Sequence, residues 1–197
     1  WFLLAAEQGH KHAQYKIGLM YKRGLGLAQD FNNAIKWYDL AAVQGHSKAQ
    51  YSLGLIFWLG NGVLQNYAKT LKYWSMAAEQ GHKEGQYGLG LMHMRAYGVT
   101  QSFEKAFKWF LLAARQGHTE SQYNIGVFYT KGYGDVKDPS LATKWFLGAA
   151  EKGHMNAQYC LGLLYWNGKY IAQDYGNAVK YFTLAAEQGH KKVQSRI

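Results

Sequence analysis

One dipeptide recurs along the chain at a fixed spacing. Gly-His occurs six times, each copy 36 residues after the one before. The copies are Gly9-His10, Gly45-His46, Gly81-His82, Gly117-His118, Gly153-His154 and Gly189-His190. A fixed period of this length is typical of stacked supersecondary units, each of which packs mainly against its neighbours. We therefore expect the 197 residues to form a repeat array rather than one globular core.

Aligning the chain on this period predicts two helices in each repeat. The first, helix A, is expected over 11–23, 47–59, 83–95, 119–131 and 155–167. The second, helix B, is expected over 31–44, 67–80, 103–116, 139–152 and 175–188. The residues at one position of the repeat are called a column below. Good N-cap residues form the column before helix B: Asp30, Asn66, Ser102, Asp138 and Asp174. The glycine of each Gly-His stands where a helix ends in a left-handed residue.

These signals predict an all-α fold, a right-handed α/α superhelix (solenoid) of about five helix pairs. Trp1 aligns with Trp37, so the chain begins inside a helix B, and residues 191–197 begin a helix A. Terminal repeats normally carry polar caps. We therefore expect residues 1–197 to form a single solenoid that is a fragment of a longer array. We also expect its truncated ends to allow self-association through exposed apolar faces.

A glycine column runs through helix A: Gly18, Gly54, Gly90, Gly126 and Gly162. Glycine inside a helix costs about 1 kcal/mol relative to alanine. The repetition of this cost indicates a close approach by a neighbouring helix. We expect the neighbour to be the alanine pair of helix B, Ala41-Ala42 and its equivalents.

Together, these columns resemble the Sel-one-like repeat (SLR) family, relatives of the tetratricopeptide repeat. In the second repeat the matching residues are Ala49-Gln50-Tyr51, Leu53-Gly54, Phe57, Gly60, Gly62-Val63, Asn66-Tyr67, Lys72-Tyr73-Trp74 and Ala77-Ala78-Glu79-Gln80-Gly81-His82. The resemblance covers the whole chain. It implies an α/α solenoid whose A helices line a concave face, and a role as an interaction scaffold or adaptor. It also implies a bacterial, virulence-associated setting, in the periplasm or outside the cell.

No motif of enzyme chemistry stands out, and we expect no catalytic residue, cofactor or metal. The Gly-x-Gly turns lack the strand and the Gly-Lys-Ser/Thr of phosphate loops. Equivalent histidines of stacked repeats should lie roughly 8–10 Å apart, too far to share a zinc ion. We interpret them as residues that cap or pack the turn. One branch of the family is rich in cysteine and has been linked to penicillin binding. A cell-wall or β-lactam-related enzyme is therefore one alternative function. The chain has a single cysteine, Cys160, which argues against that branch.

The formal net charge of +10 leaves a polyanion- or RNA-binding protein as a second alternative. Five lysines form one column: Lys36, Lys72, Lys108, Lys144 and Lys180. They lie on helix B, which the resemblance turns outward, and we interpret them as a solvated face, so nucleic acid is disfavoured as a partner. No apolar run approaches the about 18 residues that would span a bilayer, so no membrane insertion is expected.

The main hypothesis is protein–protein interaction through the concave face. By analogy with tetratricopeptide geometry, that face should carry columns rich in tyrosine, tryptophan and arginine, which interface hot spots favour. The candidate partner-binding residues are Tyr51, Tyr87, Tyr123, Trp58, Met94, Trp166, Arg23, Arg95 and Lys131. The tyrosines could instead serve only in packing. The cations favour a protein or peptide partner with acidic side chains or a C-terminal carboxylate.

Overall fold

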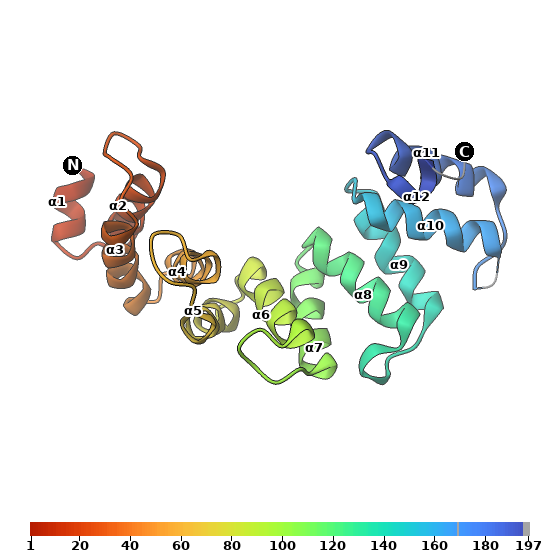
Figure 1. Ribbon diagram of the computed structural model, residues 1–197, viewed down its shortest axis with the longest axis horizontal. Helices are drawn as coiled ribbons and strands as arrows, with labels where there is room; N and C mark the ends of the chain where they lie inside the picture. The colour runs from red at the N-terminus through yellow and green to blue at the C-terminus, as the bar shows by residue number, and fades with distance from the viewer. Residues whose placement is uncertain (169, 195–197) are drawn as a thin grey trace. The chain divides into compact units, whose positions relative to one another are not determined.

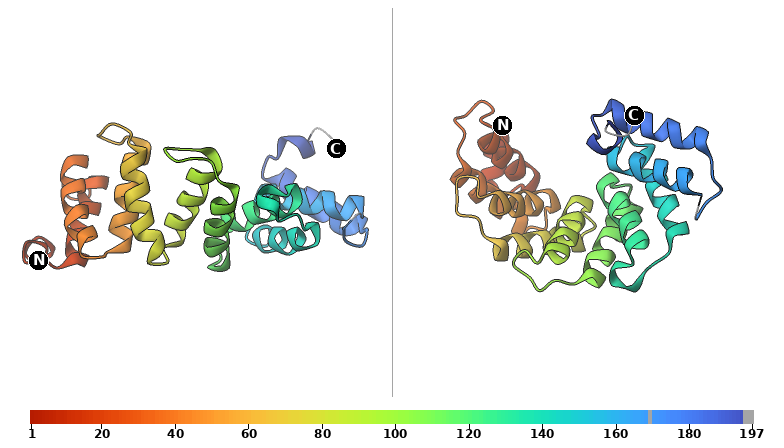
Figure 2. Two further views of the ribbon diagram at one scale, coloured as in Figure 1. Left: turned by 90° about the horizontal axis from the view of Figure 1, so that it is seen from below. Right: turned by 45° about the vertical axis from the view of Figure 1, so that its right-hand side comes forward.

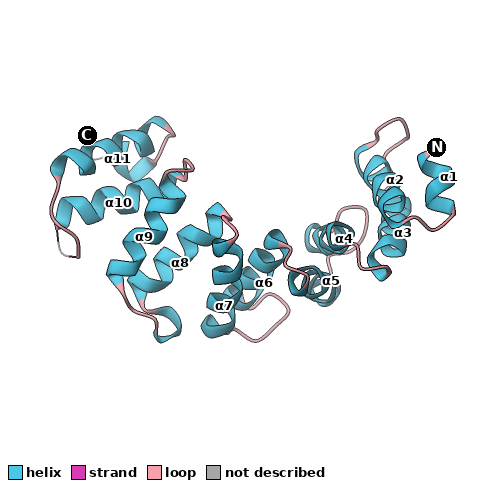
Figure 3. Ribbon diagram, turned by 180° about the vertical axis from the view of Figure 1, so that it is seen from behind, coloured by secondary structure: helices cyan, strands magenta, loops and turns pink. Residues whose placement is uncertain are grey.

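The computed structural model describes residues 1–168 and 170–194, without the side chain of Gln194. All regular structure within this part of the chain is helical (Figure 3). The A helices are α2 (Lys11–Arg23), α4 (Ser47–Leu59), α6 (Lys83–Arg95), α8 (Thr119–Lys131) and α10 (Met155–Asn167). The B helices are α3 (Phe31–Val43), α5 (Tyr67–Glu79), α7 (Phe103–Arg115), α9 (Pro139–Ala150) and α11 (Tyr175–Glu187). Two short helices, α1 (Phe2–Glu7) and α12 (Lys191–Gln194), and a 3₁₀ turn, η1 (Tyr133–Asp135), complete the chain.

These bounds confirm the predicted all-α fold and the predicted A helices. The B helices end one or two residues before the predicted limit, because the residue ahead of the glycine has left the helical conformation. Gln44, for example, has φ −85° and ψ 11°. None of the described helices has the length and hydrophobicity that a membrane span requires.

The helices form two compact units, Trp1–Gln101 with α1 to α6 and Ser102–Ile197 with α7 to α12. In the first unit α2 packs beside α3 and α4 beside α5 (Figure 1). In the second unit α8 packs beside α9 and α10 beside α11, and Figure 2 shows the same pairs from two further directions. The expectation of one continuous solenoid stays a prediction.

Side-chain and glycine caps set the ends of the helices. The Asp30 carboxylate accepts a hydrogen bond from the backbone N–H of Asn33 at 3.0 Å, which confirms it as the N-cap of α3. Gly45 after α3 has φ +77°, the left-handed conformation that closes a helix. Ala96 takes the place of a glycine after α6 and still adopts φ +59°. A left-handed conformation at a residue with a Cβ costs roughly 1–2 kcal/mol.

Four glycines of the A-helix column, Gly18, Gly54, Gly126 and Gly162, meet an aromatic ring of helix B, so the expectation that they meet the alanine pair is wrong. A Cβ on Gly18 would lie 2.7 Å from Tyr38 Cδ1, and one on Gly126 would lie 2.5 Å from Phe146 Cε1. Both distances are below van der Waals contact, so only glycine admits the ring. The alanine pair instead packs against small residues near the start of the next helix A, such as Gly85. A Cβ on Gly85 would lie 3.3 Å from Ala77 Cβ.

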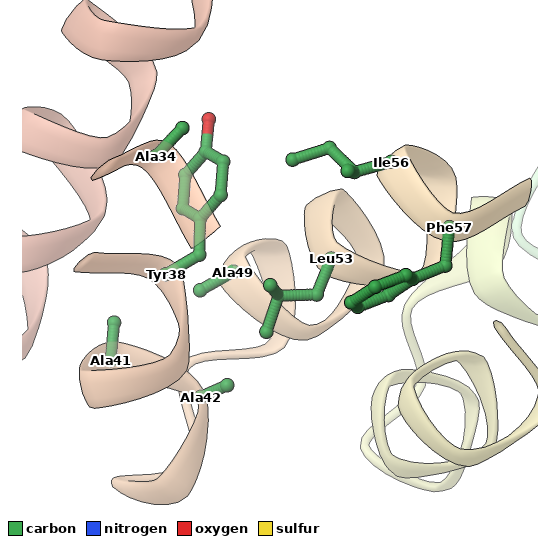
Figure 4. Close-up of a cluster of buried hydrophobic side chains, with 8 residues drawn as sticks. All are labelled: Ala34, Tyr38, Ala41, Ala42, Ala49, Leu53, Ile56 and Phe57. Carbon is green, nitrogen blue, oxygen red and sulfur yellow. The ribbon is translucent and has the colours of Figure 1, made fainter. Parts of the chain in front are cut away.

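The core of the first unit lies between helix B of one repeat and helix A of the next. Figure 4 shows one such cluster, with side chains of α3 facing side chains of α4. Its members are Ala34, Tyr38, Ala41, Ala42, Ala49, Leu53, Ile56 and Phe57. An equivalent cluster in the second unit includes Phe146 of α9, Leu161 of α10 and Tyr181 of α11. Large rings alternate with alanines, which lets the helices approach closely while filling the space between them.

Candidate partner-binding face

Five of the six Gly-His histidines cap an A helix, as the sequence predicted. The Nδ1 atom of His10, His46, His82, His118 and His154 accepts a hydrogen bond from the backbone N–H three residues later. The distance is 3.2 Å from Ala49 to His46 and 3.1 Å from Ala157 to His154. An accepting Nδ1 carries no proton, so the neutral ring carries its proton on Nε2. Among the described residues, no group of three His, Cys, Asp or Glu side chains is placed to hold a metal ion.

The tyrosine column packs on these histidines. The ring of Tyr51 stacks on His82 with centroids 4.8 Å apart, and that of Tyr123 stacks on His154 at 4.5 Å. Burial, with smaller effects of Cys160 and Glu120, raises the pKa of Tyr123 to about 12. Tyr51, Tyr87 and Tyr123 are all half-buried, so part of each side chain still reaches the surface of helix A. Packing is therefore a role that Tyr51 and Tyr123 have in the fold, whatever else they contact.

The Nε2 atom of the capping histidine faces a column that varies between repeats. His46 Nε2 lies 3.1 Å from His12 Nδ1, and His154 Nε2 lies 3.1 Å from Glu120 Oε2. In these two places a residue near the start of one helix A therefore contacts the histidine of the next repeat.

A buried glutamine column joins neighbouring repeats and was not recognised as functional from the sequence. Gln50 Nε2 donates to the carbonyl of Ala42 at 3.0 Å, and Gln50 Oε1 accepts from Gln80 Nε2 at 2.6 Å. Lys152 replaces the outer glutamine once and donates to Gln122 Oε1 at 3.2 Å. The recurrence of glutamine before each tyrosine was the signal that could have revealed this contact. These contacts explain why glutamine is constant at this position, because its side chain is used in joining neighbouring repeats.

The remaining exposed or half-buried side of the A helices is called the A-helix face. It carries the tyrosines, a leucine or valine four residues later, and the two residues that end each helix. Arg23 and Arg95 are exposed in the first unit, and Lys131 is exposed in the second. Met94 is half-buried. The aliphatic column Leu19, Leu55, Leu91, Val127 and Leu163 is also half-buried and was missed because it hardly varies.

The two tryptophans of this face have different surroundings. Trp58 is half-buried among three rings, with centroids 5.2 Å from Trp74, 5.3 Å from Tyr67 and 5.0 Å from Tyr97. Trp166 is 51% exposed, and its ring centroid lies 5.1 Å from that of Tyr175. Trp166 therefore offers far more free apolar surface than Trp58.

Two adjoining pockets lie in the second unit. A pocket of about 520 Å³ is lined by residues of α8 and α10 and by His190 to Lys192. A second pocket, of about 610 Å³, is lined by Leu163, Trp166, Phe182 and neighbouring residues, and Tyr159 borders both. Cys160 lines the first pocket, and burial raises the pKa of its thiol to about 11. A thiol with so high a pKa is a poor nucleophile at neutral pH.

Comparison with known families matches the Sel1 repeat to residues 1–10, 11–46, 47–82, 83–118, 119–154 and 156–190. The chain belongs to the Sel1 repeat family. Each internal match holds one helix A and the helix B that follows it. Sel1 repeats generally serve as scaffolds for protein–protein interaction. A comparison with curated protein sequences gave no match.

Solved structures of Sel1 repeat proteins are similar to the chain over most of its length. One is a protective antigen present in uropathogenic Escherichia coli strains, with 36% identity and a TM-score of 0.95. The similarity covers 100% of this chain and 42% of the antigen, so the chain spans about two fifths of that relative. A Sel1 repeat protein from Oxalobacter formigenes is 33% identical over 94% of this chain and 74% of its own, with a TM-score of 0.86.

A cysteine-rich relative is also similar. Helicobacter pylori cysteine rich protein B is 25% identical over 66% of this chain and 92% of its own, with a TM-score of 0.52. The present sequence contains a single cysteine, so it cannot form disulfide-linked helix pairs within the chain.

Proposed function

We propose that this Sel1 repeat chain is a non-enzymatic scaffold that binds a peptide segment or a helix of a partner protein along its A-helix face. The partner-binding residues proposed from the sequence lie on this face in each unit. Exposed cations at Arg23, Arg95 and Lys131 favour acidic groups on the partner, and Trp166 provides an apolar anchor. The relatives with solved structures named above come from bacteria, and we extend a bacterial setting to this chain.

The observation that carries this proposal is the division of labour within helix A. The capping histidines, glutamines and glycines recur because the fold uses them at every repeat. The residues at the end of helix A differ from repeat to repeat, and several remain exposed. Side chains that the fold does not require are free to select a partner.

Affinity capture with mass spectrometry tests the proposal. The tagged chain is compared with the variants Arg23→Ala/Arg95→Ala and Lys131→Ala/Trp166→Ala. Lys36→Ala/Lys72→Ala, two exposed lysines of helix B, is the matched control. We expect the specific partner to be depleted about tenfold in at least one A-helix variant and retained in the control. Equal recovery in all three variants would place the binding surface elsewhere.

A second candidate is polyanion binding through helix B. All five lysines of its column are exposed, as the sequence predicted. Two of the ammonium groups lie over neighbouring rings: Lys72 Nζ is 5.3 Å from the Tyr73 ring centroid, and Lys180 Nζ is 5.4 Å from that of Tyr181. A salt titration with single-stranded RNA tests this candidate, because counterion release makes nucleic-acid affinity fall steeply with salt. Absence of binding at a roughly physiological salt concentration of about 0.15 M would exclude it.

A further inference from the structure

The turn between α4 and α5 contains a dipeptide whose chemistry the scaffold function does not use. We propose that Asn61, in the sequence Gly60-Asn61-Gly62, is a site of spontaneous deamidation, at which the backbone nitrogen of Gly62 attacks the side-chain amide of Asn61. The inference goes beyond the proposed function. The chain carries a second Asn-Gly pair, Asn167-Gly168 at the end of α10, and the two pairs have different local structures.

The reaction needs only groups that the turn and water supply. The Gly62 nitrogen loses its proton to a base in the solvent and forms a bond to Cγ of Asn61. The side-chain nitrogen takes up a proton from the solvent and leaves as ammonia, so that a five-membered succinimide remains. Water then opens one of the two carbonyl–nitrogen bonds of the succinimide, which gives aspartate or isoaspartate without any oxidant, reductant or enzyme. Glycine favours the first step because no Cβ blocks the approach to its nitrogen.

Both reacting groups at Asn61 are free of competing contacts. Gly62 is exposed, and its N–H makes no hydrogen bond to any described residue. The N–H groups of Gly60 and Asn61, in contrast, both donate to the carbonyl of Ile56, at 2.9 and 3.2 Å. The side-chain amide of Asn61 also has no hydrogen-bond partner within the part of the chain that the structure describes. No hydrogen bond within that part therefore has to break before the nitrogen attacks.

Asn167 provides a contrast within the same chain. It is the last residue of α10, and the N–H of Gly168 donates to the carbonyl of Leu164 at 3.1 Å. This hydrogen bond holds the nitrogen towards the helix, and closure of the ring requires the backbone of Asn167 to rotate out of the helical conformation. Because the bond has to break before the attack, we expect Asn167 to react about tenfold more slowly than Asn61.

Isoaspartate at this position would disturb the packing of the turn on α3. It inserts an additional carbon into the main chain ahead of Gly62. Gly60 and Gly62 both adopt the left-handed conformation, with φ +70° and +69°, and a Cβ on Gly62 would lie only 2.5 Å from Phe31 Cβ. The N–H of Asn66 donates to the carbonyl of Phe57 at 2.9 Å and closes the turn. A longer main chain inside this closed turn has to displace Gly62 relative to Phe31.

Peptide mass spectrometry of the aged protein tests the proposal. The full chain is incubated at slightly alkaline pH, folded or in urea, and the conversion of Asn61 and Asn167 is followed on separate tryptic peptides. We expect Asn61 to react about tenfold faster than Asn167 in the folded chain and the two rates to become similar in urea. No conversion of Asn61, equal rates in the folded chain, or the same rate ratio in urea would each overturn the proposal, since the folded structure would then not favour Asn61.

Variants test the effect of the modification on the fold. Aged wild-type protein should melt roughly 2–4 °C below fresh protein, whereas aged Asn61→Gln, whose longer side chain does not form the five-membered ring, should keep its melting temperature. Asn167→Gln is the matched control and should lose as much as the wild type on ageing. Asn61→Asp carries the new charge without the additional main-chain carbon and should melt close to the fresh protein. An equal loss in Asn61→Gln, or a fresh Asn61→Asp variant that melts as low as the aged wild type, would contradict the packing effect.

Discussion

A junction here is the contact between two consecutive A helices. One junction in each unit contains an equivalent Gly-His histidine, but the Nε2 atoms of the two histidines have different partners. In both, the histidine caps a helix through Nδ1 and stacks on the tyrosine of the preceding A helix. In the first unit Nε2 of His46 meets His12, and in the second Nε2 of His154 meets Glu120. Nδ1 thus has the same structural role at both junctions, whereas the partner of Nε2 differs between them.

This difference gives the two histidines different electrostatic surroundings. Burial, followed by His12, lowers the pKa of His46, because an imidazolium there would be poorly solvated and would face a second basic ring. Lys11 and Lys48 act in the same direction. At the second junction the Nε2 atom of His154 lies 3.1 Å from the Glu120 carboxylate instead of a second basic ring. The comparison therefore separates two kinds of contact. The helix cap and the ring stack are shared by both junctions, and the Nε2 contact differs between them.

Removal of the shared contacts should have the largest effect. We expect His46→Ala and His154→Ala each to lose about 2 kcal/mol of unfolding free energy, from one helix cap and one ring stack. The melting temperature should fall by roughly 4–8 °C at neutral pH. His46→Asn, which keeps a capping oxygen, is the control and should recover about half of the loss. A loss confined to one junction would mean that the Nε2 partner matters more than the cap.

Acid should weaken the first junction. The pKa values of His46 and His82 are lowered in the folded chain, mainly by burial. As the pH falls below about 6.5, the unfolded chain binds protons first, so the stability present above that pH is lost progressively towards the lowered pKa values. Melting temperatures measured from neutral pH down to the acid range should fall, and His46→Asn should fall less steeply. A melting temperature that rises on acidification would contradict this sign.

Glu120→Gln should weaken the second junction slightly. The variant replaces the carboxylate that lies 3.1 Å from His154 Nε2 by a neutral amide, which is a weaker hydrogen-bond acceptor. We expect a loss of at most about 1 kcal/mol of unfolding free energy, because the Glu120 side chain is 56% exposed and its charge is screened. Glu151→Gln, at an exposed glutamate of the same unit, serves as the matched control. Equal losses in the two variants, measured by thermal unfolding, would show that the contact with His154 contributes nothing specific.

Transplanting the carboxylate should have the smallest effect. His12→Glu gives the first junction the chemistry of the second, and we expect it to gain roughly 0.3 kcal/mol in acid with almost no change at neutral pH. The slope of melting temperature against pH should flatten accordingly. An unchanged slope would show that burial of His46, rather than His12, controls its response.

The caps could be read from the sequence because they depend on local chemistry. Asp30 before a helix and Gly45 after one each satisfy backbone groups within a few residues of themselves. Gly54 was recognised as a close-approach position, but its partner was not, because periodicity shows which residues share a face and not which face opposes it. The ring of Trp74, rather than the alanine pair, fills that place.

For the candidate site, the sequence named Arg95, Lys131 and Trp166, and all three side chains are exposed. That they bind a partner stays a prediction. The sequence did not distinguish Trp58 from Trp166, which occupy the same column, since their exposure depends on rings brought by other segments, such as Tyr97. The pocket residues Lys191 and Lys192 were also missed, because their proximity to Asn156 arises only when neighbouring helices pack.

The sequence by itself determined the repeat, its helices and their ends, since a 36-residue period and local capping residues act over short stretches of chain. Tertiary structure alone decided which groups contact the Nε2 atoms of His46 and His154 and which rings meet Gly18, Gly54, Gly126 and Gly162. Those features depend on distances between side chains of different repeats, and such distances are set by how the helices pack against one another.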